Sequence, residues 1–295
     1  MVTIRPRRSV LYMPGSKERA LEKGKSLPTD AIIFDLEDAV APDMKDMARD
    51  QVAKAVEAGG YGQRELIIRV NGLDTPWFKE DLKAAASAKP NAILVPKVSS
   101  GEDIRSVRDQ LKALGSDPSI DIWAMMETPL AMLKALDIAE NGPSESHRLA
   151  VFIMGTNDLS KETGAAIKPG REAMLAWLST CVAAGRAFGI DIVDGVYNDF
   201  KDEDGFKTEC AQGNDLGMDG KTLIHPGQIG PCNEIFSPSA EAVEWDKKII
   251  EAFELPENQG KGAITVDGKM VELLHAEMAK RTVAISEAIE ALAQS

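Results

Sequence analysis

The sequence has little cysteine, few aromatic residues and no long apolar run. Three cysteines, Cys181, Cys210 and Cys232, occur among 295 residues, and this odd, widely separated set supports neither a disulfide framework nor a cysteine zinc site. No segment approaches the ~20 apolar residues that cross a membrane. The N-terminal sequence MVTIRPRRSV lacks the apolar core of a signal peptide. We therefore expect a soluble, cytoplasmic protein with no membrane partner.

Positive charge and nucleotide-binding motifs are scarce as well. Lys and Arg number 34 against 47 Asp and Glu, which gives a net charge of −13. Nucleic acids attract basic surfaces, so no nucleic-acid partner is expected. The chain contains neither a GxxxxGK[ST] loop nor a GxSxG motif, and no Ser–His or Cys–His spacing indicates a nucleophile. One local basic segment lies in the first 25 residues and includes Lys17, and it could hold a phosphorylated ligand.

Short β-branched runs alternate with helical segments along most of the chain. The predicted strands span residues 9–13, 31–35, 66–70, 92–95, 120–125, 150–154, 190–193 and 221–224. They are mostly continuous apolar runs, which is typical of parallel strands buried on both faces. Eight such units predict an α/β protein with a (β/α)8 TIM barrel over residues 1–254. A doubly wound open sheet is the alternative.

The last part of the chain lies outside the count of eight units. Apolar residues at helical spacing predict helices over 43–58 and 173–188 inside the barrel, and an extra helix over 238–253 follows it. Residues 255–268 are rich in Gly and Pro, and a final helix is expected from about 269 to 293. Residues 255–295 are therefore expected to form either a lid with its helix or a packing decoration.

Polar side chains follow nearly every predicted strand. Active sites of TIM barrels are built at the carboxyl ends of the strands. The residues at these ends are Pro14, Asp35, Glu37, Asp38, Arg69, Asn71, Lys97, Glu127, Asp158, Asp194 and His225. Each acidic residue alone could cap a helix. Capping explains poorly why three strands end this way, because buried like charges are costly unless they are paired or bind metal.

A divalent cation would reconcile this acidic cluster. No Cys or His pair has ligand spacing, so carboxylate oxygens point to Mg²⁺, with Mn²⁺ as a substitute. Glu127 and Asp158 follow neighbouring strands and are the candidate ligands. Glu37 and Asp38, with Asp35 beside them, would orient metal-bound waters.

Arg69 is the natural group to bind a substrate carboxylate, because its guanidinium can engage both oxygens. The alternative is a structural ion pair with Asp35 or Glu127. Tyr12, Pro14, Lys17 and Lys97 would surround the substrate at the same end of the barrel. His225 precedes a proline, and it is expected to be a structural hydrogen-bonding residue rather than a base.

Eight motifs in order also resemble a known family. They are RRSVLYMPG, FDLEDAVAP, IIRVNGLDTPW, LVPKV, METP, GTNDL, GKTLIHPGQI and GKGAITVDGKMVE, from residue 7 to 272. Together they resemble the citrate lyase β-subunit-like group of the HpcH/HpaI aldolase superfamily, which includes malyl-CoA and citramalyl-CoA lyases and (3S)-malyl-CoA thioesterase.

The resemblance implies a TIM barrel with Mg²⁺ on Glu127 and Asp158 and a substrate carboxylate on Arg69. It also implies that CoA, as part of the substrate, lies across the barrel mouth. Asp267 would come from a C-terminal lid that closes over a neighbouring subunit's site, as a catalytic acid or base. A homo-oligomer, either a trimer or a hexamer, is the expected assembly.

The family divides between two reactions. The leading expectation is cleavage of a C–C bond in malyl-CoA, methylmalyl-CoA or citramalyl-CoA, which gives acetyl- or propionyl-CoA and a 2-oxoacid. The alternative is hydrolysis of the (3S)-malyl-CoA thioester. The short segment 163–171 departs from the longer insertion of bacterial malyl-CoA lyases, which raises the thioesterase and citramalyl-CoA alternatives. A citrate lyase β-subunit and a non-catalytic CoA-binding barrel rank below these.

Overall fold

A closed barrel of eight parallel strands forms the main body of the protein. The computed structural model describes residues 4–294. The strands are joined in sequence order, with β8 returning to β1. They are β1 (Ser9–Pro14), β2 (Ala31–Asp35), β3 (Glu65–Arg69), β4 (Ala92–Val95), β5 (Asp121–Met126), β6 (Leu149–Met154), β7 (Asp191–Asp194) and β8 (Gly220–Leu223). The predicted TIM barrel is confirmed, and the open-sheet alternative is wrong.

Alternate side chains of the strands fill the barrel interior. They form a buried cluster of Val10, Ala31, Ile33, Ile67, Ala92, Leu94, Trp123, Met125, Val151, Ile153 and Val193. Most of the remaining apolar side chains of the strands pack outward against the helices. At the amino ends of the strands, Arg7 lies over the Trp123 ring at 5.3 Å and pairs with Glu65. The interior is therefore a packed core, and space for a ligand remains at the carboxyl ends.

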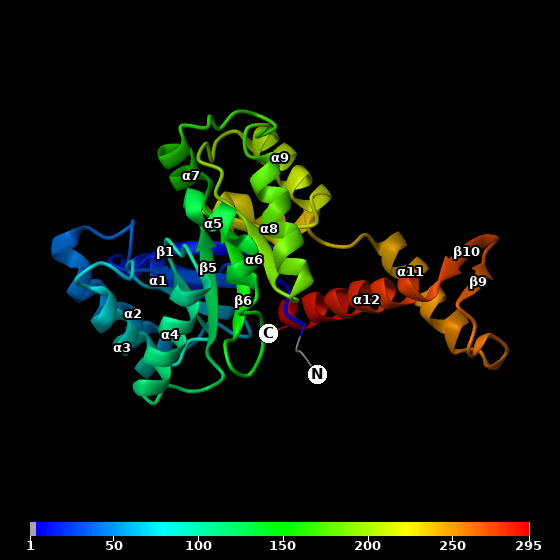
Figure 1. Cartoon of the computed structure of the whole chain (residues 1–295), viewed down its shortest axis with the longest axis horizontal. Coiled ribbons are helices and arrows are strands. Elements are labelled where there is room, and N and C mark those ends of the chain that lie inside the picture. The colour runs from blue at the N-terminus through cyan, green and yellow to red at the C-terminus, as the bar shows by residue number, and fades with distance from the viewer. Residues whose placement is uncertain (1–3, 295) are drawn as a thin grey trace. The chain divides into compact units, whose positions relative to one another are not determined.

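Helices surround the strands (Figure 1). Those of the barrel unit are α1 (Glu18–Gly24), α2 (Lys45–Ala58), α3 (Phe78–Ala88), α4 (Gly101–Ala113), α5 (Pro129–Leu133), α6 (Ala135–Ala139), α7 (Thr156–Thr163), α8 (Leu175–Ala187), α9 (Glu203–Asp215) and α10 (Ile229–Ile235). A 3₁₀ turn, Pro42–Met44, precedes α2, so the helix expected from residue 43 begins at Lys45. Within residues 4–294, no helix combines the length and the apolar character that a membrane crossing requires.

The chain divides into two compact units, and the barrel unit is Arg7–Phe236. Among the described residues, the other unit consists of residues 237–294 together with residues 4–6. In it, α11 (Ala240–Glu254) and α12 (Leu273–Ala293) pack side by side around Ile249, Ile264 and Ala279 (Figure 1). The sequence prediction assigned residues 237–254 to the barrel. In the structure α11 belongs to the C-terminal unit.

The C-terminal unit also contains a β-hairpin that the sequence interpretation missed. Strands β9 (Ala263–Val266) and β10 (Lys269–Glu272) pair in antiparallel fashion around Asp267 and Gly268. Both turn residues have positive φ, 47° and 78°, as a two-residue hairpin turn requires. The expectation that a helix begins near residue 269 is therefore wrong, and α12 starts at Leu273.

Candidate functional site

A cavity of about 390 Å³ opens among the residues that follow the carboxyl ends of the barrel strands. Seven of the predicted site residues line it: Tyr12, Pro14, Asp35, Asp38, Arg69, Glu127 and Asp158. The rest of the wall combines apolar residues, among them Met154, Val196 and Ile224, with polar residues, among them Asn157 and Asn198. Lys17 is exposed at the start of α1 and does not line the cavity. The expectation that charged residues gather at the carboxyl ends of the strands is therefore confirmed for the residues that line this cavity.

Arg69 ends β3 and is held by a two-point ion pair. Its Nε and Nη2 donate to the two carboxylate oxygens of Asp35, at 2.7 and 2.6 Å. Burial would raise the pKa of Asp35, but the Arg69 charge and hydrogen bonds from the Glu37 and Ala39 amides hold it below its usual value. Of the two roles predicted for Arg69, the structure shows the ion pair with Asp35. That pair fixes one edge of the guanidinium and leaves the Nη1 end directed at other groups.

The Nη1 end of Arg69 meets groups on the cavity side. Glu37 Oε2 lies 2.8 Å from Nη1, whereas Asp38 Oδ2 lies 3.4 Å away on a side chain that is 64% exposed. The Tyr12 ring stacks under the guanidinium at 4.8 Å. Burial is the main reason that the pKa of the Tyr12 phenol is raised. The weak, exposed Asp38 contact is the one that an incoming carboxylate can replace at least cost.

Glu127 directly follows β5, and its side chain is only 1% exposed. Its Oε1 accepts a hydrogen bond from the Lys97 amide at 2.7 Å. Burial, together with the Asp158 and Glu37 carboxylates, raises the pKa of Glu127 to about 7, although Lys97 opposes the shift. A Cβ atom on Gly155 would stand 2.3 Å from Glu127 Cβ, so only glycine fits beside this carboxylate.

Asp158 lies in the first turn of α7, and Lys97 connects it to Glu127. Lys97 Nζ lies 3.0 Å from Glu37 Oε1, 3.7 Å from Asp158 Oδ1 and 4.0 Å from Glu127 Oε1. Burial alone would lower the pKa of Lys97, but the carboxylates outweigh it and raise the pKa above its usual value. The capping alternative for Asp158 is wrong, because Gly155 is the N-cap of α7.

The donor set fits a hard divalent cation. Asp35, Asp38, Glu127 and Asp158 line the cavity together with Arg69, and Glu37 and Lys97 contact these groups without lining it. No group of three or more His, Cys, Asp or Glu side chains in residues 4–294 is arranged to hold a metal. Mg²⁺ needs only one or two carboxylates and takes its other ligands from water and substrate. Glu127 and Asp158 are therefore the residues that would hold it.

A buried lysine that sequence reasoning missed supports the segment after β2. Lys45 Nζ donates to the carbonyls of Leu36 and Glu37 and to Asn71 Oδ1, at 2.7–2.8 Å. Asn71 is fixed in turn by Asp81, which accepts from its backbone and side-chain nitrogens. A lysine at the start of an amphipathic helix is usually solvated, so no pattern in the sequence indicates these buried hydrogen bonds of Lys45.

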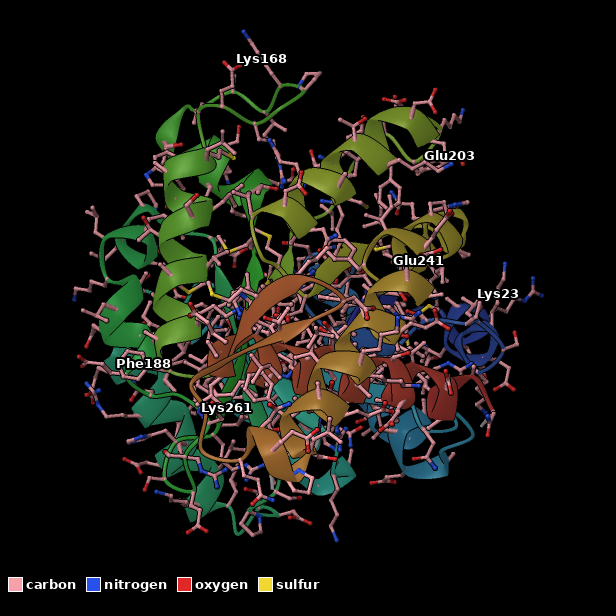
Figure 2. All side chains as sticks on the ribbon, turned by 90° about the vertical axis from the view of Figure 1, so that its right-hand side faces the viewer. Lys23, Lys168, Phe188, Glu203, Glu241 and Lys261 are labelled. Carbon is pink, nitrogen blue, oxygen red and sulfur yellow. The ribbon has the colours of Figure 1, made fainter. Side chains whose placement is uncertain are left out.

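Asp194, at the end of β7, belongs to a separate buried cluster. It pairs with Arg171 at 2.7 Å and with Lys221 at 2.8 Å, and Lys221 also reaches Glu209. These cations hold the pKa of Asp194 below its usual value despite complete burial. Arg171 anchors the end of the short segment between α7 and α8, from which Lys168 projects outward (Figure 2). The cluster is therefore structural.

Two further predicted residues lie outside the cavity lining. His225 Nδ1 accepts from the Gly227 amide at 3.1 Å and caps a 3₁₀ turn, as expected for a structural histidine. Asp267 occupies the β9–β10 turn in the C-terminal unit, where it is 60% exposed and pairs with Lys248 at 3.0 Å. Its predicted catalytic role stays a prediction.

The sequence of the barrel matches the model of a known family. The family model described as HpcH/HpaI aldolase/citrate lyase matches residues 8–226, which is the barrel almost entirely. The chain belongs to this family. The resemblance drawn from the eight motifs is thereby confirmed.

Curated relatives of this family member carry the names of different reactions. A protein of Cereibacter sphaeroides strain ATCC 17025 named (3S)-malyl-CoA thioesterase is 52% identical over 290 residues, which is 98% of both chains. Human mitochondrial citramalyl-CoA lyase is 32% identical over 97% of this chain and 87% of its own. The citrate lyase subunit beta of Escherichia coli K12 is 33% identical over 91% and 89%.

Solved structures agree with the family assignment. The crystal structure of protein CitE from Mycobacterium tuberculosis in complex with magnesium, acetoacetate and coenzyme A superposes with a TM-score of 0.72. It is 25% identical and covers 95% of this chain and 98% of its own. The similarity therefore extends over the barrel and most of the C-terminal segment.

Proposed function

We propose that this protein is a Mg²⁺-dependent enzyme that hydrolyses the thioester of (3S)-malyl-CoA to free CoA and malate. One observation carries the proposal. Glu127, Asp158 and Arg69 line one cavity in a chain that is 52% identical, over nearly its full length, to proteins named (3S)-malyl-CoA thioesterase. The magnesium and CoA of the CitE complex support the same ligand classes. Mn²⁺ is the expected substitute metal.

The residues of the barrel would bind and orient the acyl group. Arg69, fixed by Asp35, offers its Nη1 end to the substrate carboxylate in place of Asp38. Glu127 and Asp158 would hold the metal. When bound, Mg²⁺ supplies Lewis-acid polarisation of a substrate oxygen. Met154, Val196 and Ile224 would pack against the acyl group.

Hydrolysis requires a base for the attacking water, and Asp267 is the proposed residue. Its carboxylate is exposed on the hairpin turn and pairs with Lys248. We propose that it reaches the site of a neighbouring copy in a trimer or hexamer. It would accept a proton as the C–O bond forms, and the proton would then go to the departing CoA sulfur as the C–S bond breaks. The proposed compartment is the cytoplasm.

C–C cleavage at the same site is the second candidate. The citramalyl-CoA lyase relatives favour it, and the metal and the arginine would serve either reaction. Products separate the two. Purified protein with Mg²⁺ and (3S)-malyl-CoA should release CoA and malate in equal amounts. Acetyl-CoA and glyoxylate would show cleavage instead, and chelation of the metal should stop either reaction.

A matched pair of variants tests the metal site in the same assay. Glu127→Gln removes one metal ligand without changing side-chain size, and turnover should fall at least a hundredfold. Glu140→Gln makes the same change at an exposed residue of the α6 C-cap and should leave turnover unchanged. Normal turnover of Glu127→Gln would refute the proposal.

A further inference from the structure

One cationic side chain stands among the carboxylates that would hold the metal. The Lys97 ammonium hydrogen-bonds Glu37 Oε1 at 3.0 Å and lies within 4.0 Å of both Glu127 and Asp158. Its side chain is 40% exposed, so the ammonium has room to leave this position. Sequence reasoning assigned Lys97 to the substrate, whereas in the structure its charge is directed at the proposed metal ligands.

The backbone of Lys97 is also unusual. Its φ is 54°, a left-handed conformation that is strained for a residue with a Cβ atom. In this conformation the Lys97 amide donates to Glu127 Oε1 while the ammonium faces the same carboxylate. One residue therefore both orients Glu127 and neutralises part of its charge. Strain of this kind persists where the surrounding structure enforces it, and it concentrates at functional sites.

We propose that Lys97 is a resident counter-ion that competes with the divalent cation for Glu127 and Asp158. The inference rests on the proposed metal site. An ammonium within 4.0 Å of both carboxylates cannot keep that position beside a divalent cation without strong charge repulsion. On metal binding, Lys97 gives up these two contacts and keeps its hydrogen bond to Glu37. Lys97 thereby lowers the affinity of the metal-free site for a cation and offsets the repulsion between its carboxylates until the ion arrives.

Calorimetric titration with MgCl₂, without acyl-CoA, tests this directly. Lys97→Met removes the charge and should bind Mg²⁺ at least tenfold more tightly than the wild type, which corresponds to about 1.4 kcal/mol. Lys97→Gln should shift in the same direction, and Lys97→Arg should remain within about threefold of the wild type. Lys89→Met is the matched control, because Lys89 also has a φ of 54° but precedes β4 rather than following it.

The outcomes separate this inference from the proposed function. In one outcome, the wild type binds Mg²⁺ and Glu127→Gln does not, while folded Lys97→Met and Lys97→Gln bind Mg²⁺ no more tightly than the wild type. This result would overturn the counter-ion role of Lys97 and leave the proposed metal site intact. Wild-type binding that is insensitive to Glu127→Gln would overturn the metal site, and the role of Lys97 with it. Thermal unfolding of each variant confirms that the titrated protein is folded.

Discussion

Gly155→Ala is the substitution whose effect follows most directly from the coordinates. The new Cβ would stand 2.3 Å from Glu127 Cβ and 2.7 Å from its Oε2. Carbon atoms pack favourably at ~3.5–4.0 Å, so one of the two segments must move by roughly 1 Å. The φ of Gly155 is −93°, which alanine tolerates, so backbone strain does not contribute. The expected damage is displacement of the Glu127 carboxylate.

The magnitude can be estimated from that displacement. Overpacking of a buried position costs about 1–3 kcal/mol of stability. A misplacement of about 1 Å in a reacting constellation can lower the rate by about a hundredfold. We expect Gly155→Ala to lower kcat/KM by about a hundredfold and to weaken Mg²⁺ binding. The free energy of unfolding in urea should fall by only about 1–3 kcal/mol, so the variant should remain folded.

The control is Gly230→Ala in α10, where a Cβ meets nothing within 4 Å and helix propensity improves. It should retain full activity and equal or higher stability. Wild-type kcat/KM and metal affinity in Gly155→Ala would refute the claim that this glycine positions Glu127.

Three further predictions concern carboxylates with different partners. Asp35→Asn removes the negative charge that orients Arg69, so KM should rise and kcat/KM should fall at least tenfold in steady-state assays. Asp38→Asn changes only an exposed contact at 3.4 Å, so its kcat/KM should stay within about threefold of the wild type. Equal effects of the two substitutions would contradict the orienting role of Asp35. Asp194→Asn leaves Arg171 and Lys221 without their buried counter-charge, so the free energy of unfolding in urea should fall by about 3–5 kcal/mol. A decrease of less than about 1 kcal/mol would be inconsistent with a buried ion pair. Asp267→Asn keeps a residue that tolerates positive φ, so acyl-CoA binding measured by calorimetry should persist while turnover is lost; unchanged turnover would remove Asp267 from the mechanism.

The barrel was predictable because its strands are short, continuous apolar runs. Ala31–Asp35 is buried at every position, and Ala92–Val95 likewise, so the sequence pattern and the burial coincide. The hairpin around Asp267 was missed because its strands have only four residues each and lie in a segment rich in Gly. The Asp–Gly pair at positions 267–268 is a strong hairpin signal, and it would have identified the turn.

The sequence predicts which residues gather at the site, but it does not predict which of them form ion pairs with one another. The rule that barrel active sites follow the strands brought Glu127, Asp158 and Arg69 to one cavity. The carboxylate that pairs with Arg69 is set by the strand register, which places Asp35 opposite Arg69. The sequence alone leaves both Asp35 and Glu127 possible as this partner. The position of the Lys97 ammonium depends on a backbone conformation that no periodicity in the sequence encodes.

We propose that Glu127 and Asp158 hold one divalent cation beside Arg69. A crystal of the full chain soaked in MnCl₂ tests it through the anomalous signal of manganese. We expect a single strong peak between the Glu127 and Asp158 carboxylates, and we expect this peak to be absent from Glu127→Gln crystals soaked in the same way. A soaked crystal with no peak at these carboxylates, or with the peak retained in the variant, would contradict it.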